Sequence, residues 1–475
     1  MRIVHVSCND LHGSRFNGHD MQIAFNKRGI SCKQFVMDKY GNDLNTIPLF
    51  YDEEPFLRWL CMKFESDLSI HNMVLPYGWR LLNHPEFKDA DVVHYHCIHN
   101  YVLSLAMFRQ LTLAKPSVLT LHDPWFFTGH CVHPLDCDKW EREKCINCSH
   151  LDRFFPMKEN NANYMWEYKK EVFSNIDIDI VVSSKWMLDL MQRSPITSHI
   201  ERVHLIPFGI DTNLFYSKNR NKSEIRKRLG IGQDDVVLCF RSETSLFKGV
   251  PYIQEMLDLL NVPLPVTLLT VGEKGLIKNK KYNLVENGRV NDDEKMADFY
   301  AAADIFLMPS TAEAFGLMAI EAMSSELPII VTQGTALPEV TFAPECGVSI
   351  ERDNAEQFTK AVTRLIEDSN ERRRRGELGR KLALENYKVE DHYKKMLELY
   401  ESITERKRRG LSINNIGEYP LSRDLQIFYN FSLLLNDLSE KYMELTRKAP
   451  TRISFKRKIS HVMKKLVEKL GLKAF

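Results

Sequence analysis

The chain has 475 residues, of which 44% are hydrophobic and 27% are charged, and its formal net charge is +1. This length exceeds the size at which one hydrophobic core keeps growing, so we expect a globular protein of two or more domains. The sequence has no uninterrupted apolar run of about 18 residues and no internal repeat, which argues against a membrane-spanning helix and a repeat protein.

Strand-type and helical segments alternate from the first residue, which predicts a parallel sheet covered by helices. Residues 3–7 form the first strand pattern and lack the long apolar region of a signal peptide, so a cytoplasmic protein is expected. A loop bearing Gly13 and Gly18 follows, and a helix is expected over residues 19–28 with Gly29 as its C-cap. This loop is not a dinucleotide-binding fingerprint, because the G-x-G-x-x-G spacing is absent.

Two further strand patterns, residues 92–96 and 118–122, end in histidines. Ligands of open α/β sheets bind at the carboxyl ends of the strands. His122, in the sequence Thr120-Leu-His-Asp-Pro-Trp125, is therefore a candidate site residue. The alternative is a packed polar side chain, which is the more common role of a lone histidine.

Four of the ten cysteines lie within 18 residues, and their spacing closes with C-x-x-C. Thiolates at such spacings suit a tetrahedral zinc ion with Zn–S distances of about 2.3 Å. In a reducing compartment, clustered cysteines are more often metal ligands than disulfides. We predict a structural zinc site that pins the segment 129–150; the alternative is four reduced thiols in a loop. The predicted ligands are Cys131, Cys137, Cys145 and Cys148, and His130, His133 or His150 could replace one of them.

A segment containing proline and glycine, residues 207–211, marks the expected crossing into a second domain. After a helix over residues 222–229, the strand pattern 236–240 ends at Arg241, and Lys248 follows seven residues later. Two cations at this edge suit a phosphate-bearing leaving group, on which negative charge accumulates as its bond breaks. The alternative is a pair of surface cations beside a loop.

The stretch from Pro309 to Met323 organises the second half of the chain. An apolar strand pattern precedes it, and a turn containing Gly316 leads into a run of helix formers. A strand, a glycine turn and a helix N-terminus together form an anion site. Glu313 and Glu321 lie eight residues apart, roughly 12 Å along a helix. That is about the length of a diphosphate with a sugar ring at each end; the alternative is two glutamates flanking a surface helix.

The C-terminal part is predicted to be helical over residues 354–387, 392–408 and 409–440. From Arg447 to Phe475, ten Lys or Arg stand against one acidic residue, and the apolar residues beyond Pro450 recur at helical spacing. Such a basic amphipathic helix can lie on an anionic membrane. Docking on the protein's own acidic body is the alternative, and RNA binding is disfavoured because aromatic residues for base stacking are nearly absent.

These motifs occur together and in order. The sequence from Glu313 to Glu321 resembles the E-x7-E motif of the retaining glycosyltransferases of family 4, which have the two-domain GT-B fold. Residues 206–215 resemble the family's interdomain segment, and Arg241 with Lys248-Gly249 resembles its phosphate clamp, although the spacing between the cations is longer here. The segments 120–125, 183–186, 303–308 and 345–348 resemble further family motifs, and 129–150 is similar to the Cys-rich segment of bacterial exopolysaccharide and lipopolysaccharide glycosyltransferases.

The resemblance implies an α/β protein of the GT-B fold, with two Rossmann-like domains whose parallel sheets face each other across a cleft, and a helical C-terminal extension. The expected divisions are an acceptor-side domain over 1–207 with the Cys-rich insert 129–150, a nucleotide-sugar domain over 208–387, a crossover helix over 388–408 that packs back on the first domain, and the extension over 409–475.

The same resemblance assigns roles to individual residues. Glu321 would hold the ribose of a nucleotide sugar, and Glu313 would hold the hydroxyls of the donor sugar. The loop with Gly13 and Arg15 would face the acceptor, although a solvated loop arginine is the alternative. The remaining implied contacts are His122 on the donor sugar or acceptor, and Phe315, Gly316, Leu317, Arg241 and Lys248 on the diphosphate.

The implied function is hexosyl transfer, with retention of configuration, from a UDP- or GDP-sugar to a saccharide or lipid-linked saccharide in cell-surface polysaccharide synthesis. No catalytic metal and no nucleic-acid partner are expected, and the protein would work in the cytoplasm, at the inner face of the membrane if its tail binds there. The D-x-D sequences 89–91 and 177–179, a metal-binding dyad in other glycosyltransferases, are interpreted as solvated strand boundaries. A GT-B nucleotide-sugar epimerase and a membrane-attached scaffold that binds nucleotide sugars without turnover are the alternatives.

Overall fold

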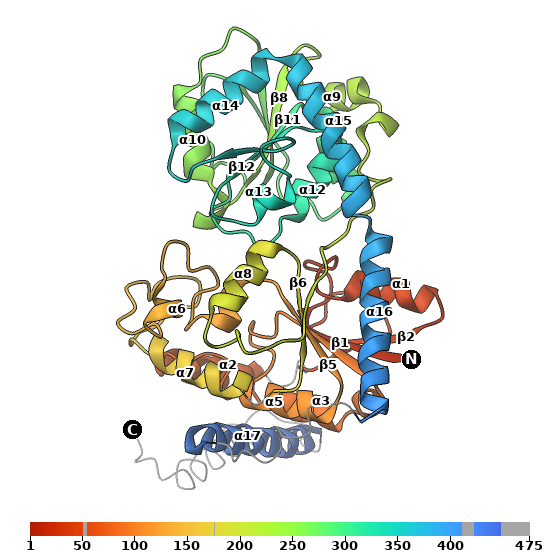
Figure 1. Ribbon diagram of the computed structural model, residues 1–475, viewed down its shortest axis with the longest axis vertical. Helices are drawn as coiled ribbons and strands as arrows, with labels where there is room; N and C mark the ends of the chain where they lie inside the picture. The colour runs from red at the N-terminus through yellow and green to blue at the C-terminus, as the bar shows by residue number, and fades with distance from the viewer. Residues whose placement is uncertain (51–54, 175, 411–421, 448–475) are drawn as a thin grey trace.

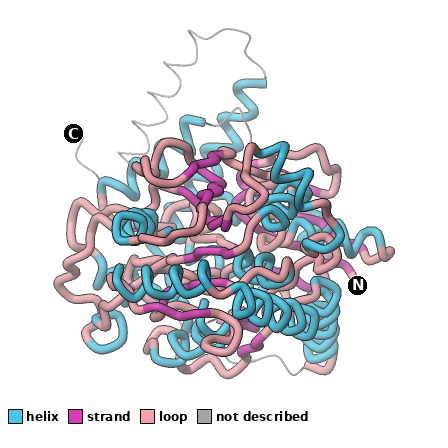
Figure 2. The backbone as a smooth tube through the Cα atoms, turned by 90° about the horizontal axis from the view of Figure 1, so that it is seen from above, coloured by secondary structure: helices cyan, strands magenta, loops and turns pink. Residues whose placement is uncertain are grey.

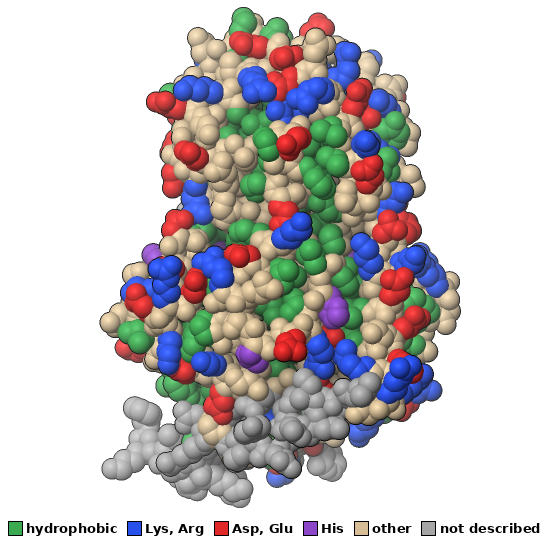
Figure 3. All heavy atoms as spheres, in the orientation of Figure 1, with side chains coloured by type: hydrophobic (Ala, Val, Ile, Leu, Met, Phe, Trp, Pro, Cys, Tyr) green, Lys and Arg blue, Asp and Glu red, His purple; other side chains and the backbone are tan. Residues whose placement is uncertain are grey.

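The structure, a computed structural model, describes residues 1–50, 55–174, 176–410 and 422–447. Two α/β domains lie one above the other along the long axis of the molecule, and helices surround the strands of each (Figures 1 and 2). On the face drawn in Figure 3, acidic and basic side chains are interspersed over both domains. Within the described residues, no helix is both long and apolar enough to cross a membrane.

The first domain is built on a seven-stranded parallel sheet whose strand order is β3-β2-β1-β4-β5-β6-β7. Strands of this kind are covered on both faces, so they are apolar throughout; all five residues of β5 are buried. The order reverses between β1 and β4, the place where open sheets bind ligands. The strands are β1 (Arg2–Asn9), β2 (Ser31–Asp38), β3 (Thr46–Pro48), β4 (Val92–His96), β5 (Ser117–Leu121), β6 (Asp179–Val182) and β7 (Val203–Leu205).

Between its strands, the described part of the first domain contains eight α-helices and one 3-10 helix. The first begins after Gly18, and α8 begins at Ser184, whose hydroxyl accepts a hydrogen bond from the Met187 amide at 3.2 Å. The helices are α1 (His19–Lys27), α2 (Pro55–Asp67), α3 (Tyr77–Asn83), α4 (Pro85–Lys88), α5 (Leu105–Ala114), η1 (Pro124–Phe127), α6 (Lys139–Arg142), α7 (Ala162–Ser174) and α8 (Lys185–Arg193).

The second domain repeats this design with a six-stranded parallel sheet of order β10-β9-β8-β11-β12-β13. Its order reverses between β8 and β11, so the loops that follow these two strands meet at one edge. The strands are β8 (Val236–Ser242), β9 (Val266–Gly272), β10 (Asn283–Glu286), β11 (Ile305–Met308), β12 (Ile329–Thr332) and β13 (Val348–Ile350).

The helices of the second domain follow the predicted pattern, with one break. Asp368 divides the helical stretch predicted over 354–387, because its carboxylate caps a new helix by accepting from the Glu371 amide at 2.8 Å. The helical segments are η2 (Ser217–Asn219), α9 (Lys222–Leu229), η3 (Leu246–Lys248), α10 (Val250–Leu259), α11 (Asp293–Ala302), α12 (Leu317–Ser324), α13 (Leu337–Val340), α14 (Ala355–Glu367) and α15 (Ser369–Asn386).

The chain then returns to the first domain as α16 (Val389–Arg408), which runs along its side in Figure 1. The apolar face of α16 packs into a core that includes Ile3, Phe25 and Val181. At the crossing, Ile210 and Lys388 form a parallel bridge. A Cβ atom on Gly209 would lie 2.5 Å from the Lys388 carbonyl oxygen, so only glycine allows the two crossing segments this close approach.

The extension contains α17 (Arg423–Arg447), which packs against α3 and α5 of the first domain (Figure 1). Leu435 is fully buried in the first domain's core, and the Trp79 indole donates a hydrogen bond to the Ser432 hydroxyl at 3.2 Å. Residues 448–475, which carry most of the predicted basic amphipathic tail, lie outside the described residues. Its membrane contact therefore stays a prediction.

The two domains also touch directly. The Glu339 carboxylate of the second domain accepts the backbone amides of Lys185 and Trp186, at 2.8 and 2.9 Å, at the start of α8. The Ser184 hydroxyl donates to the Ala314 carbonyl at 2.8 Å. These bonds join the N-terminus of α8 to α13 and to the loop that precedes α12, so the start of α12 lies at the domain interface.

Candidate active site

The centre of the candidate site is the turn from β11 into α12. Gly316 has a φ of 98°, in the left-handed region, and a Cβ atom there would meet the Leu337 side chain at 2.5 Å. No side chain caps the helix that follows. The Ala319 amide donates to the Gly316 carbonyl at 3.0 Å, and the preceding amides of Leu317 and Met318 have no acceptor among the described residues, at the positive end of the helix dipole.

Lys248 and Glu313 meet beside this helix N-terminus, with Nζ 2.5 Å from Oε1. Both side chains are mostly buried. Their loops are held together by the Thr311 amide, which donates to the Phe247 carbonyl at 2.9 Å. Gly249 permits this approach, since a Cβ atom there would lie 2.1 Å from the Pro309 carbonyl oxygen. The structure thus brings together two residues predicted from separate motifs.

Arg241 lies apart from this pair. Its side chain is 46% exposed, and its Nε is 2.9 Å from the carboxylate of Glu243 in the following loop. Glu313, the partner of Lys248, is not among the ion-pair partners of Arg241 in the described structure. The loop from Ser242 to Phe247, longer than the resembled family's spacing, separates the two cations.

Glu321 lies on α12 with its side chain only 1% exposed. One carboxylate oxygen accepts from the Tyr300 hydroxyl at 2.8 Å, and the other accepts from the Arg15 guanidinium of the first domain. Burial raises the pKa of Tyr300 well above its usual value, and the neighbouring Glu321 carboxylate raises it further. Tyr300 therefore remains a neutral donor that orients Glu321.

Arg15 was expected to face an acceptor, and the structure places it across the domain interface on Glu321 and 3.7 Å from Asp293. Burial alone would lower its pKa, but these two carboxylates raise the pKa above the usual value. Gly13, at φ 72°, forms the turn that presents Arg15: its carbonyl accepts from the amide of Phe16 at 2.9 Å. Sequence reasoning missed Tyr300 and Asp293, because both lie on α11, far along the chain from Arg15.

His122 follows β5 and lies among aromatic rings at the interface. Its imidazole stacks on the Phe208 ring, with centroids 5.6 Å apart and planes 9° apart, and the Phe16 ring lies 5.4 Å away. Phe208 in turn lies 5.4 Å from the Phe315 ring, just before α12. Burial lowers the pKa of His122 to about 4. His122 is thus linked through Phe208 to the predicted phosphate-binding turn.

The segment after His122 is held by buried polar groups that the sequence did not indicate. The Asp123 carboxylate lies 3.0 Å from His99 Nε2 and accepts the Trp125 amide at 2.9 Å. Lys169, fully buried on α7, donates to the carbonyl of Trp125 at 2.6 Å and to that of Thr128 at 3.1 Å. These contacts fix the chain between β5 and the Cys-rich segment.

All four predicted zinc ligands, together with His130, line one small cavity in the first domain. None of these four cysteines is in a disulfide. The Gly129 amide donates to Cys145 Sγ at 3.3 Å, and the His150 amide donates to Cys148 Sγ at 3.4 Å. No three of the four sulfurs lie within 4.8 Å of one another; in the described part of the chain only His5, His94 and His96 bring three potential ligand atoms that close.

Both D-x-D sequences are engaged in ion pairs. Asp177 pairs with Arg202, and Asp179 pairs with Arg406 of α16. Asp89 lies 2.8 Å from the Arg2 guanidinium. Asp179 thus helps to attach α16 to the first domain.

Comparison with known proteins agrees with this architecture. The profile of glycosyl transferases group 1 matches residues 221–382, and the profile of glycosyltransferase family 4 matches residues 51–214. An MMP alpha-(1->4)-mannosyltransferase of Mycolicibacterium hassiacum is 27% identical over 66% of this chain and 71% of its own length. A D-inositol 3-phosphate glycosyltransferase of Xylanimonas cellulosilytica is 25% identical over 44% of this chain, and the match spans only about half, 53%, of that relative.

Solved structures share the fold. Sucrose-phosphate synthase of Thermosynechococcus elongatus superposes with a TM-score of 0.60 at 19% identity, covering 85% of this chain and 99% of that one. HepE of Anabaena, solved with UDP and glucose, superposes with a TM-score of 0.61 at 15% identity, covering 85% of this chain and 100% of that one. This likeness confirms the predicted GT-B fold. With matching family profiles over both of its domains, the chain belongs to the group 1 glycosyltransferases of family 4.

Proposed function

We propose that this glycosyltransferase moves a hexose from a nucleotide sugar to a saccharide or lipid-linked saccharide, with retention of the anomeric configuration and without a catalytic metal. The observation that carries the proposal is the Lys248–Glu313 pair beside the uncapped N-terminus of α12. A cation and free helix amides suit a diphosphate, and a carboxylate next to them suits sugar hydroxyls.

In the proposed mechanism, Glu321 accepts from the ribose hydroxyls and Glu313 accepts from hydroxyls of the donor sugar. The amides of Phe315, Gly316 and Leu317 face the diphosphate. Negative charge accumulates on the departing diphosphate, and preorganised donors there lower the barrier. The departing phosphate itself takes the acceptor proton, so no carboxylate nucleophile is needed.

Lys248 supplies the cationic charge on the leaving group, and Arg241 joins it only if its exposed side chain turns from Glu243 toward the diphosphate. Arg15 bonds Glu321 across the interface. Since Arg15 is a cation on the acceptor-side domain, its second proposed role is to bind a phosphate of the acceptor once donor binding engages Glu321.

UDP- and GDP-sugars are the proposed donors. HepE of Anabaena was solved with UDP and glucose, and the relative from Mycolicibacterium hassiacum is a mannosyltransferase. The proposed setting is the cytoplasmic face of the membrane, in cell-surface polysaccharide synthesis. This rests on the similarity of residues 129–150 to the Cys-rich segment of exopolysaccharide enzymes and on the basic composition of residues 447–475.

A donor screen tests the proposal. The full chain is incubated with UDP-, GDP- and ADP-sugars, and both thermal unfolding and slow donor hydrolysis are followed. One nucleotide class is expected to raise Tm by a few degrees, because a ligand that binds only the folded state stabilises it. The free sugars without nucleotide serve as controls. No response to any nucleotide sugar contradicts the proposal, and binding without hydrolysis or transfer favours the scaffold alternative.

A structural zinc ion in the Cys-rich segment belongs to the same proposal. Four thiols facing one cavity are the donor set of a closed zinc site, and the amides of Gly129 and His150 donate to two of the sulfurs, those of Cys145 and Cys148. Tetrahedral ligation places all four sulfurs about 3.8 Å from one another, whereas no three of them lie within 4.8 Å of one another here. When bound, the ion supplies a crosslink that holds the loop, and it takes no part in the transfer.

Metal analysis of the purified chain is expected to find about one zinc ion per chain, as a closed site requires. Cys148→Ser is expected to lose this zinc and to unfold at lower temperature. Cys32→Ala, which alters a buried cysteine of the same domain outside the segment, is the matched control and is expected to retain zinc. Well under half an ion per wild-type chain contradicts the zinc site.

A further inference from the structure

Three histidines of the first domain, His5, His96 and His122, lie progressively closer to the carboxyl edge of the sheet, where the candidate site is. His5 of β1 pairs in register with His94 of β4, and His96 lies two residues further along β4. His96 pairs with Thr120 of β5, and His122 lies two residues beyond Thr120. Side chains two residues apart on a strand share one face. Each step from His5 to His96 to His122 therefore crosses one strand and approaches the carboxyl edge of the sheet.

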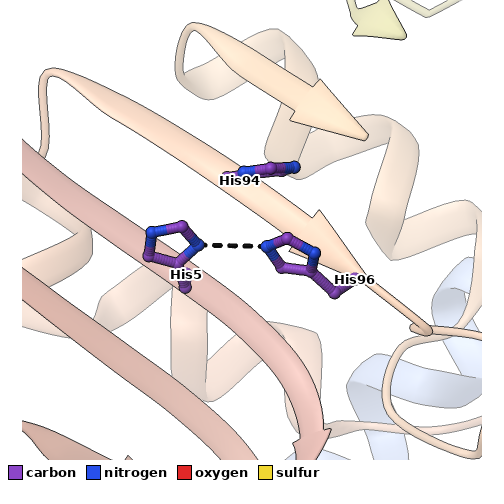
Figure 4. Close-up of side chains that lie close together, drawn as sticks. All are labelled: His5, His94 and His96. Atoms are coloured by element: carbon purple, nitrogen blue, oxygen red, sulfur yellow. Dashed lines mark hydrogen bonds between the residues drawn. The ribbon is translucent and has the colours of Figure 1, made fainter. Parts of the chain in front are cut away.

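Hydrogen bonds connect these three rings, which we call the relay. His5 Nδ1 lies 3.0 Å from His96 Nε2, the contact marked in Figure 4. His96 Nδ1 lies 3.3 Å from His122 Nε2. His94 stands beside the relay but is bonded elsewhere, with Nδ1 2.6 Å from the Tyr400 hydroxyl and Nε2 2.7 Å from the Thr120 hydroxyl.

Gly18 packs so closely against the His5–His96 contact that a side chain at position 18 would not fit. Gly18, at φ 92°, precedes α1 and packs against the first bond of the relay. A Cβ atom on Gly18 would lie 2.6 Å from His5 Nδ1 and 3.0 Å from His96 Nε2. Any other residue at this position would therefore push the two rings apart.

All three rings are neutral at neutral pH. Burial lowers the pKa of His5 to about 3 and that of His122 to about 4, and it lowers the pKa of His96 well below its usual value. Asp123 raises the pKa of His122 and His99 lowers it, and both act less than burial. Three neutral imidazoles carry three N–H protons, and the two bonds between them use two of these protons.

The two hydrogen bonds of the relay can both point toward His5, which we call inward, or both toward His122, which we call outward. The two arrangements differ in whether His5 Nε2 carries a proton. His5 Nε2 is buried and has no hydrogen-bond partner among the described residues. If the bonds run inward, this atom is a buried N–H without an acceptor; if they run outward, it is a lone pair without a donor. Orphaned buried N–H groups are the rarer and costlier defect. The outward direction is therefore favoured, with His5 donating to His96 and His96 donating to His122.

We propose that His96, held by His5, fixes His122 as the tautomer with its proton on Nδ1, so that His122 offers a hydrogen-bond donor to an oxygen of the ligand. No described residue bonds His122 Nδ1, and this atom is not among the fully buried ones. A sugar hydroxyl and a phosphate oxygen both accept such a bond. His122 is then not a general base, because its lone pair is occupied by His96.

The identity of this ligand rests on the proposed function, whereas the tautomer of His122 does not. His96 is a positioning residue, since it acts on the ligand only through His122. The ring of His122 stacks on Phe208, which contacts Phe315 at the start of the phosphate-binding turn. The donor N–H is thereby fixed at the interface where both substrates would meet.

The tautomer can be read directly from the full chain labelled with 15N-histidine, in long-range proton–nitrogen correlation spectra. The signal of His122 is assigned by its loss in His122→Asn. We expect a protonated Nδ1 and a bare Nε2 in the wild-type protein. A protonated Nε2 on His122 overturns the proposal, and this readout needs neither a substrate nor a folded His96 variant.

The causal role of His96 is tested in His96→Phe, which keeps a ring of similar size but removes both nitrogens. His122 is then expected to shift toward the Nε2-protonated form, and kcat is expected to fall about 10-fold with little change in KM, the loss of one hydrogen bond. His94→Gln is the matched control, because His94 has the same strand, face and burial but lies outside the relay. An unchanged His122 tautomer in His96→Phe overturns the proposal.

A third experiment distinguishes the relay from a metal site. It is needed because the clustered imidazoles of His5, His94 and His96 could also ligate a metal ion. If one equivalent of zinc, added beyond the ion proposed for the Cys-rich segment, shifts the signals of all three rings together, the relay is wrong and the cluster binds metal. Unchanged signals support the relay. A correct tautomer combined with no turnover of any nucleotide sugar contradicts the proposed function alone.

Discussion

Lys248→Ala is expected to lower kcat by about 100- to 1,000-fold, the usual effect of removing one group that stabilises charge developing in the transition state. Lys248 lies beside the uncapped N-terminus of α12, where the diphosphate is proposed to depart. The change also leaves Glu313 without its cation in a mostly buried place. Donor hydrolysis and transfer, measured at saturating nucleotide sugar, would show the loss.

Lys218→Ala is the matched control for this experiment. Lys218 also pairs with a glutamate, at 2.9 Å from Glu326, but Glu326 follows the opposite end of α12. Its removal is expected to change kcat by less than about twofold, because an exposed ion pair contributes little. A Lys248→Ala enzyme that retains wild-type kcat would exclude Lys248 from leaving-group stabilisation.

Glu321→Gln is expected to raise the KM for the nucleotide sugar by about 10- to 100-fold, with a smaller effect on kcat. A carboxylate that accepts from ribose hydroxyls forms charge-assisted bonds, which a neutral amide replaces poorly. The substitution keeps the size of the side chain, so Tyr300 still has an acceptor. Initial rates over a range of donor concentrations, together with direct titration of the free nucleotide, measure the effect.

Glu326→Gln provides the comparison, since it removes a carboxylate just beyond the far end of the same helix. It is expected to leave the KM for the donor unchanged. Donor affinity in Glu321→Gln equal to that of the wild-type chain would remove Glu321 from the ribose site, even if turnover falls. Loss of kcat with unchanged KM would instead place Glu321 near the reacting sugar.

The fold could be predicted largely because its signals are local. Continuous apolar strands, glycine turns and helix caps each depend on a few adjacent residues, and their alternation indicates parallel sheets. The errors have local causes as well. The pattern of residues 284–290 predicts a strand over the whole segment, but β10 ends at Glu286, because Gly288 turns the chain at φ 72° and its carbonyl accepts from the Gly272 amide at 2.8 Å.

The site could be predicted only in part. Glu313, Gly316 and Glu321 belong to one continuous motif, so their proximity follows from the sequence. The contact of Arg15 with Glu321 joins residues 306 positions apart on different domains, and no periodicity encodes it. The same holds for Tyr300 on Glu321 and for the relay, whose members lie on β1, on β4 and just after β5 and become neighbours only through the sheet register.

The two crossings between the domains have a mechanical consequence. The chain enters the second domain at Ile210 and returns to the first at Lys388. There the Ile210 amide donates to the Tyr387 carbonyl at 2.9 Å, and the Val389 amide donates to the Ile210 carbonyl at 3.0 Å. Two hydrogen-bonded segments side by side form a flat, two-stranded connection. Such a connection bends more easily out of its plane than within its plane. We therefore expect any movement between the domains to take place mainly about one axis. Closure on a donor would then be a rotation in a single plane, and it would change the distance between Arg15 and Glu321.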